Sequence, residues 1–180
     1  EWGADLILKM IMVHGFFHGD PHPGNIFVLR NNVICFIDFG MVGILKPRHM
    51  NFLAGFTLGF ARKDAKTITQ SILNLCNKKF YEYSEELEFE IEDMLRKYSY
   101  MPFEKIDFSQ ILQEIVNVIV KYKLQIPSSI FLLAKALATI QKFAERLHPE
   151  MSLGLVVMPY AKDLLKSRYG PTQIASGIYN

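Results

Sequence analysis

Cysteine, net charge and long apolar runs are all scarce in this sequence of 180 residues. Its two cysteines, Cys35 and Cys76, lie far apart inside apolar segments, which argues against a disulfide scaffold and favours a reducing compartment. Twenty basic residues against 18 acidic ones leave a formal charge of only +2, too small to predict a nucleic-acid partner. Lys9, Lys135 and Pro159 interrupt the longest apolar stretches before they reach the roughly 20 residues that a membrane-spanning helix needs.

The remaining composition is that of one globular unit. Half of the residues are apolar and 13% are aromatic, which is enough for a sizeable core. Residues up to about Gly43 are rich in Gly, Pro and His, whereas the rest of the chain has the periodicity of helices. Because the sequence opens at Glu1 without an initiator Met or a signal-peptide pattern, we expect a piece of a longer protein.

The pattern predicts a mostly α-helical fold with one small β-hairpin. Asn31 and Asn32 separate two β-prone runs, and this dipeptide tolerates the left-handed backbone of a two-residue hairpin turn. Pro47, Asp64, Ser84 and Asp107 are suited to the first positions of helices. The predicted elements are a helix at 4–13, a loop at 16–25, strands at 26–30 and 33–37, and helices at 47–61, 64–75, 84–98, 107–122, 127–147 and 155–169.

The polar residues are concentrated in the loop and at the end of the hairpin. Five residues out, two in the turn and five back would place Asn25 beside Asp38. An amide oxygen and a carboxylate at one point suit Mg²⁺, which accepts few protein ligands and retains water and phosphate oxygens. Asp20, on the loop leading to this point, could orient or accept the proton of an attacking hydroxyl. The sequence thus predicts a site for phosphoryl transfer, which requires mainly positioning from a protein.

Two motifs in this region resemble those of a known family. The spacing H-x-D-x-x-x-x-N followed by D-F-G is similar to the catalytic loop and metal loop of protein-kinase-like folds. The form His-Gly-Asp-Pro-His-Pro-Gly-Asn, with Gly-Phe-Phe before it and Met-Val-Gly after the second motif, resembles the UbiB/ADCK family of atypical kinases. That family often has Ala where this sequence has Gly19, a change of one small residue for another that we expect to matter little.

The resemblance assigns roles to individual residues and implies cofactors. Asp20 would be the catalytic aspartate, His18 would brace the loop, and His22 would face the transferred phosphate. Asn25 and Asp38 would hold Mg²⁺, and together with Phe39 and Gly40 would form the part of the site that binds ATP. The chain would be only the C-terminal lobe of a protein-kinase-like fold, with its catalytic loop, hairpin and metal loop at 16–45 and a helical region at 46–180. Since the N-lobe is missing, we expect this fragment alone to be inactive.

The resemblance further implies a kinase or ATPase that supports isoprenoid quinone (ubiquinone) biosynthesis. The expected partners are a nucleotide, a lipid or quinone-precursor small molecule, the protein's own N-lobe and a membrane surface, with no nucleic acid. The expected setting is membrane-associated, at the cytoplasmic side of a bacterial inner membrane, or in a mitochondrion or plastid. No Ser, Thr or Tyr occurs between Met41 and Phe56, so a phosphorylated activation loop is not expected, and a small-molecule or lipid-linked substrate is favoured.

Several alternatives remain open at this stage. A phosphotransferase of the aminoglycoside or choline kinase type has a similar loop, and a kinase-shaped binding scaffold would need no chemistry. The four-residue spacing of His14, His18 and His22 would form a zinc site on a helix, but Pro21 and Pro23 disfavour that helix. The acidic run at 82–93 is more simply a solvated helix face. The basic segment around Lys162, Lys166, Arg168 and Tyr169 is more simply a packed helix than a membrane-surface one.

Overall fold

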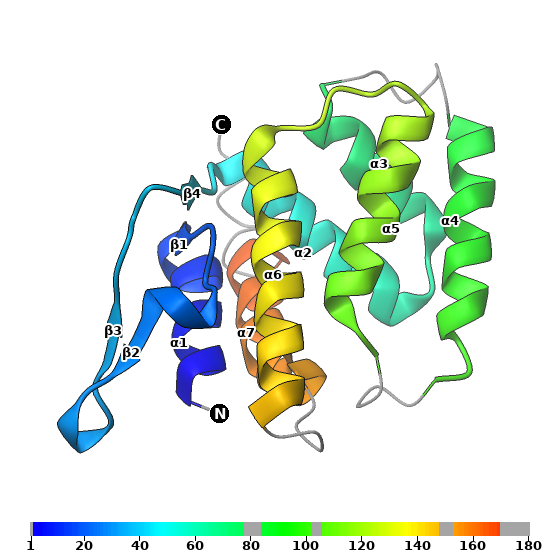
Figure 1. Ribbon diagram of the computed structural model, residues 1–180. Helices are drawn as coiled ribbons and strands as arrows, with labels where there is room; N and C mark the ends of the chain where they lie inside the picture. The colour runs from blue at the N-terminus through cyan, green and yellow to red at the C-terminus, as the bar shows by residue number, and fades with distance from the viewer. Residues whose placement is uncertain (1, 78–83, 102–105, 148–152, 170–180) are drawn as a thin grey trace.

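Most of the chain folds into helices, with two short two-stranded sheets near the N-terminus (Figure 1). The computed structural model describes residues 2–77, 84–101, 106–147 and 153–169. In chain order the elements are α1 (Trp2–Lys9), the π-helix η1 (Met10–His14), β1 (Phe16–His18), the 3₁₀ helix η2 (Pro23–Asn25), β2 (Ile26–Val28), the 3₁₀ helix η3 (Arg30–Asn32), β3 (Ile34–Phe36), β4 (Val42–Ile44), α2 (Pro47–Arg62), α3 (Ala65–Leu75), α4 (Ser84–Tyr98), α5 (Phe108–Lys121), α6 (Ser128–Leu147) and α7 (Leu153–Tyr169). The prediction of a mostly helical fold with a small hairpin is confirmed.

The first sheet closes the polar loop at its base and was not predicted. β1 pairs antiparallel with β4, with Phe17 opposite Gly43. Gly15 ends the N-terminal helix in a left-handed conformation (φ 61°), which turns the chain into β1. A three-residue strand inside a segment rich in Gly, Pro and His gives no period-2 signal of its own, and its partner lies 26 residues further along the chain. The predicted loop at 16–25 is therefore partly strand.

The second sheet is the predicted hairpin, with a register one residue away from the expected one. β2 pairs with β3, and Ile26 lies opposite Phe36. The Leu29 N–H donates to the Val33 carbonyl at 2.7 Å, which closes a three-residue loop in place of the expected two-residue turn. Within that loop only Asn31 has a left-handed backbone (φ 62°). Asn25 therefore lies opposite Ile37, one residue before Asp38, and not opposite Asp38 itself.

The remaining helices begin and end close to the predicted positions because their caps are local. The Asp64 carboxylate accepts the Thr67 N–H at 3.1 Å, and the Asp107 carboxylate accepts those of Ser109 and Gln110. Helices α2 and α3 pack closely, with Gly59 allowing Ile68 to approach the α2 backbone. Helix α7 contains Pro159 and packs against α1 and α2, as expected for a packed helix.

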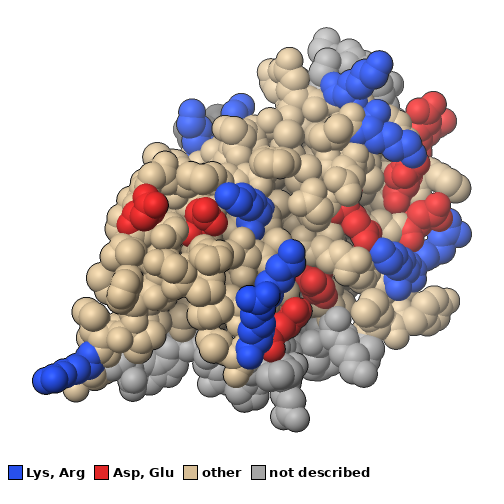
Figure 2. Space-filling model, viewed as in Figure 1, with Lys and Arg blue, Asp and Glu red and all other residues tan. Residues whose placement is uncertain are grey.

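The surface differs between the two ends of the molecule. In Figure 2, basic and acidic side chains alternate over α4 and α5, whereas the hairpin carries few charged groups. Glu90 of α4 pairs with Lys121 of α5, and Lys97 of α4 pairs with Glu114 of α5, so the two helices share a solvated, ion-paired face. Within the described residues, no helix is both long and apolar enough to cross a bilayer.

His49, near the start of α2, is both buried and part of a helix cap. Its side chain is 2% exposed, and its Nδ1 accepts the Lys46 N–H at 3.1 Å at the start of α2. Burial of the imidazole, reinforced by the nearby Arg48 guanidinium, lowers the pKa of His49.

This burial predicts a pH-dependent stability. The folded state favours the neutral imidazole, while the unfolded chain takes up a proton near pH 6.5. The contribution of His49 to the free energy of unfolding is therefore complete above about pH 6.5. It is lost as the pH falls through the lower pKa of the folded state. Urea unfolding at pH 7.5 and 5.5 should show a smaller pH-dependent loss for His49→Gln than for the wild type. His14→Gln, at an exposed histidine, is the control, and equal losses in wild type and His49→Gln would contradict the prediction.

Candidate active site

The polar loop, residues 18–25, is held at its first residue by a fully buried imidazole. His18 Nδ1 accepts the Asp20 N–H at 3.1 Å, so Nε2 carries the proton and donates to the Ile37 carbonyl at 3.2 Å. The ring also contacts Phe36 and Phe39, with centroids 5.7 and 5.3 Å away. His18 thus ties the polar loop to the end of β3 and to the first residues that follow it. The Gly19 N–H donates to the Met41 carbonyl at 2.8 Å and fixes the same two segments a second time.

Asp20 lies at the open side of the loop, with a cation next to it. Its side chain is 38% exposed, and Oδ2 is 3.7 Å from Lys135 Nζ on α6. The Asn25 amide donates to the Asp20 backbone carbonyl at 3.2 Å, which closes the loop across five residues. Lys135 was not predicted as a site residue, because it lies 115 positions away in a helix whose period indicates only core packing. Only the packing of α6 beneath the loop reveals it.

Asp38 begins the second segment of the site at a sharp change in backbone direction. Its φ is 56°, and its Oδ1 accepts the Gly40 N–H at 3.1 Å, so Asp38, Phe39 and Gly40 form a tight turn. The preceding residue, Ile37, donates its N–H to the Asn25 carbonyl at 2.9 Å, which places Asp38 next to the end of the ladder at Asn25. Asn25 Oδ1 and Asp38 Oδ2 have no hydrogen-bond partner within the described part of the chain. These two hard oxygen donors fit a Mg²⁺ ion, which prefers oxygen ligands.

The remaining predicted residues lie at the rim. His22 is exposed, and its Nδ1 accepts the Gly24 N–H at 3.1 Å, which caps the short helix η2. Phe39 is 53% exposed even though its ring contacts His18. His14 lies in η1, His18 in β1 and His22 before η2, so these three histidines do not share one helix face.

Comparisons with known proteins match two family models to this chain. Residues 1–72 match the model of the ABC1 atypical kinase-like domain, and residues 91–152 match that of the UbiB helical domain. The chain belongs to the UbiB/ADCK family. The match to the ABC1 atypical kinase-like domain covers the whole polar loop and the Asp38 turn. This match is consistent with a protein-kinase-like fold.

Curated relatives include named and uncharacterised proteins. A protein of Clostridium pasteurianum from the 5′ region of hydrogenase 1 is 33% identical over 90% of this chain and 31% of its own length. A Synechocystis protein is 37% identical over 74% of this chain and 33% of its own length. The probable protein kinase UbiB of Marinobacter nauticus is 27% identical over the whole chain and 34% of its own length. The chain thus spans about a third of the length of these UbiB/ADCK relatives. No solved structure matches it.

An Ala at Gly19, the residue often found in UbiB/ADCK proteins, would require the half-buried Leu132 side chain to move. A Cβ at Gly19 would lie 2.8 to 2.9 Å from three side-chain atoms of Leu132, closer than carbon atoms approach. We expect Gly19→Ala to cost about 1–3 kcal/mol of the free energy of unfolding, the usual range for overpacking. In a Leu132→Ala background the same change should cost at least about 1 kcal/mol less, because the obstructing atoms are gone. Urea unfolding of the four chains measures this coupling, and strictly additive effects would contradict it.

Proposed function

We propose that this chain is the part of a UbiB/ADCK-type atypical kinase or ATPase that binds Mg²⁺-ATP and carries its catalytic aspartate. The observation that supports this most is that hydrogen bonds hold Asp20, Asn25 and the start of the Asp38 turn next to one another. The Asp20 carboxylate is partly exposed, and Asn25 Oδ1 and Asp38 Oδ2, which have no hydrogen-bond partner among the described residues, belong to segments that backbone hydrogen bonds hold together. None of these oxygens is needed to cap a long helix or to satisfy the core.

In this proposal Asn25 and Asp38 hold Mg²⁺, which would neutralise the charge on the nucleotide phosphates. Asp20 accepts or orients the proton of the attacking hydroxyl or water. Lys135 is a positioning residue that keeps the Asp20 side chain at the open side of the loop. His18 fixes the direction of the same loop from beneath, since both of its ring nitrogens are occupied by backbone partners.

The proposed biological role is support of ubiquinone biosynthesis at a membrane, with a lipid or quinone precursor as the phosphoryl acceptor or regulator. This part depends on the family and on relatives named probable protein kinase UbiB. The bacterial inner membrane, mitochondrion or plastid remains the proposed location.

We also propose that the exposed apolar side chains of the hairpin are covered by the N-lobe of the longer protein. Phe27, Val28, Leu29 and Val33 are each more than half exposed, at 52%, 72%, 52% and 52%. Soluble proteins seldom leave so many neighbouring large apolar side chains in water without a partner. Relatives about three times as long as this chain provide the additional sequence.

Nucleotide binding and turnover by the full-length protein test the proposal. Calorimetry should detect ATP binding that is strengthened by Mg²⁺, and ATP turnover should require the same ion. Lys135→Met should lower kcat by up to about fivefold with little change in ATP affinity, because this cation orients Asp20 through an exposed pair worth roughly 1 kcal/mol. Lys142→Met, at an exposed lysine further along α6, is the matched control.

Two results would contradict the proposal. Absence of Mg²⁺-dependent ATP binding would remove the metal and nucleotide assignments. Full biological activity of an Asp20→Asn, Asp38→Asn double variant would indicate a kinase-shaped binding scaffold instead.

A further inference from the structure

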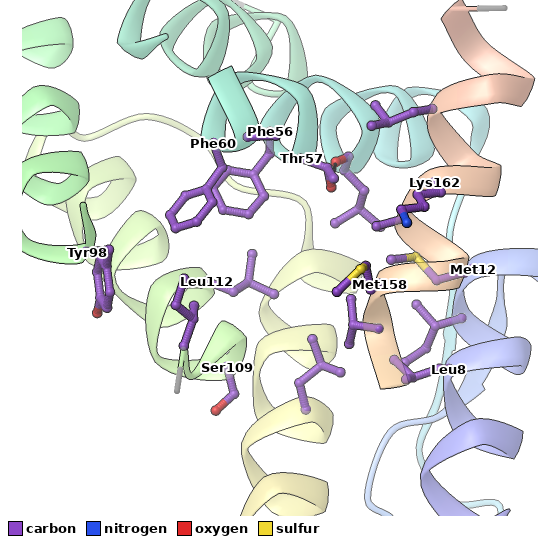
Figure 3. Close-up of a pocket in the computed structure, with 18 of the residues that line it drawn as sticks. Leu8, Met12, Phe56, Thr57, Phe60, Tyr98, Ser109, Leu112, Met158 and Lys162 are labelled. Carbon is purple, nitrogen blue, oxygen red and sulfur yellow. Dashed lines mark hydrogen bonds between the residues drawn. The ribbon is translucent and has the colours of Figure 1, made fainter. Parts of the chain in front are cut away.

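A large apolar cavity lies between the helices, away from the polar loop. It has a volume of about 430 Å³ and is lined by residues of α1, η1, α2, α4, α5, α6 and α7 (Figure 3). None of the residues of the polar loop or of the Asp38 turn lines it. Protein interiors rarely contain voids much larger than a water molecule, whereas 300–1,000 Å³ is typical of ligand pockets. The cavity is therefore of the size of a binding site.

The chemistry of the wall restricts what this cavity can hold. Leu8, Phe56 and Leu112 are typical of the lining, which is mostly apolar. The neutral polar groups in the wall already use their hydroxyl protons. Thr57 donates to the Leu53 carbonyl at 2.7 Å and Tyr98 to the Glu114 carboxylate at 2.9 Å. Since they offer no free donor, the body of a ligand must itself be apolar.

Two cations at the edge of the cavity remain available for a ligand. Lys63, at the C-terminal end of α2, and Lys162 of α7 both line the cavity and are exposed. Neither ammonium has an ion-pair or hydrogen-bond partner among the residues that the structure describes. Figure 3 shows the Lys162 side chain reaching from α7 toward Thr57 of α2. Two unpaired positive charges beside an apolar cavity complement a negatively charged head group.

We propose that this cavity binds a single-chain amphiphile whose apolar chain lies among the helices and whose anionic head pairs with Lys63 and Lys162. The proposal does not depend on the proposed catalytic function, because the two sites share no residue.

Three dodecyl compounds with different head groups test this in the full-length protein. Dodecyl phosphate, dodecyl maltoside and dodecyltrimethylammonium are titrated calorimetrically, each below its critical micelle concentration. We expect one saturable site per chain for dodecyl phosphate and at least about fivefold weaker binding of the cationic compound. Affinity should increase from octyl to decyl to dodecyl phosphate by roughly fourfold for each added methylene, as expected when the alkyl chain is buried. Equal affinity for the three head groups, or no dependence on chain length, would overturn the proposal.

Variants locate the site. Lys162→Met keeps the apolar part of the side chain. It should weaken the binding of dodecyl phosphate roughly twofold to fivefold while leaving the binding of dodecyl maltoside unchanged. Lys166→Met, one turn further along α7 and outside the cavity lining, should change neither. Ala161→Phe should fill the cavity and abolish binding of all three compounds, with melting curves reporting its fold. If Ala161→Phe does not fold, the series of octyl, decyl and dodecyl phosphate and the two lysine variants still decide whether the cavity binds the amphiphile. Binding only to phosphatidylglycerol vesicles, with none to monomeric amphiphile, would overturn the cavity assignment in favour of a surface site.

Discussion

Replacing Asp38 should reduce Mg²⁺-dependent ATP turnover of the full-length protein by about 10³-fold or more. A metal ion contributes several kcal/mol of charge stabilisation to phosphoryl transfer, and each 1.4 kcal/mol corresponds to a tenfold change in rate. Asp38 supplies the only carboxylate among the two proposed ligands. Its removal should therefore weaken the binding of both the metal ion and the nucleotide. The measurement is steady-state ATP turnover with calorimetric determination of ATP affinity at several Mg²⁺ concentrations.

The choice of substitution matters because the Asp38 backbone is left-handed. With φ at 56°, Asp38→Ala combines loss of the carboxylate with backbone strain, whereas Asn tolerates this conformation well. Asp38→Asn should therefore retain the fold and still lose most of the turnover, since it removes the negative charge. Asp93→Ala, at an exposed acid of α4 that pairs with Arg96, is a control that should leave turnover unchanged. Turnover within a few-fold of wild type in both Asp38 variants would refute the metal assignment.

Phe17→Ala should lower the free energy of unfolding by about 3–5 kcal/mol, the usual cost of deleting a buried phenylalanine ring. Phe17 is fully buried in β1 and fills the space left by the missing side chain of Gly43 in β4. A loss of this size is a large part of the roughly 5–15 kcal/mol by which a domain is stable. Phe16→Ala provides the control. The Phe16 ring is 41% exposed, so its deletion should lower the free energy of unfolding much less. Urea unfolding of the full chain measures both.

The same pair allows a reciprocal test. A Cβ at Gly43 would lie 2.1 Å from Phe17 Cζ, so Gly43→Ala alone should be destabilising. Combined with Phe17→Leu, the Gly43→Ala change should cost at least about 1 kcal/mol less than in the wild type. If Phe17→Ala costs no more than Phe16→Ala, the β1–β4 contact does not stabilise the polar loop as we infer.

Local signals predicted the helices well because their ends are decided by residues a few positions away. The Asp64 and Asp107 caps and Pro47 at the start of α2 needed no knowledge of the tertiary fold. The hairpin was also predicted, but its register was not. The length of the hairpin loop changes by one residue depending on whether one or two asparagines adopt a left-handed backbone. The Asn-Asn dipeptide alone does not determine which of these conformations forms.

The sequence by itself determined the helical architecture, the family and the polar residues His18, Asp20, Asn25 and Asp38, because each depends on short-range patterns and spacings. The tertiary structure alone decided the β1–β4 pairing, the position of Lys135 beside Asp20 and the cavity bordered by Lys162. These features join segments far apart in the chain. Their formation depends on how whole helices pack against one another, which no local pattern of residues encodes.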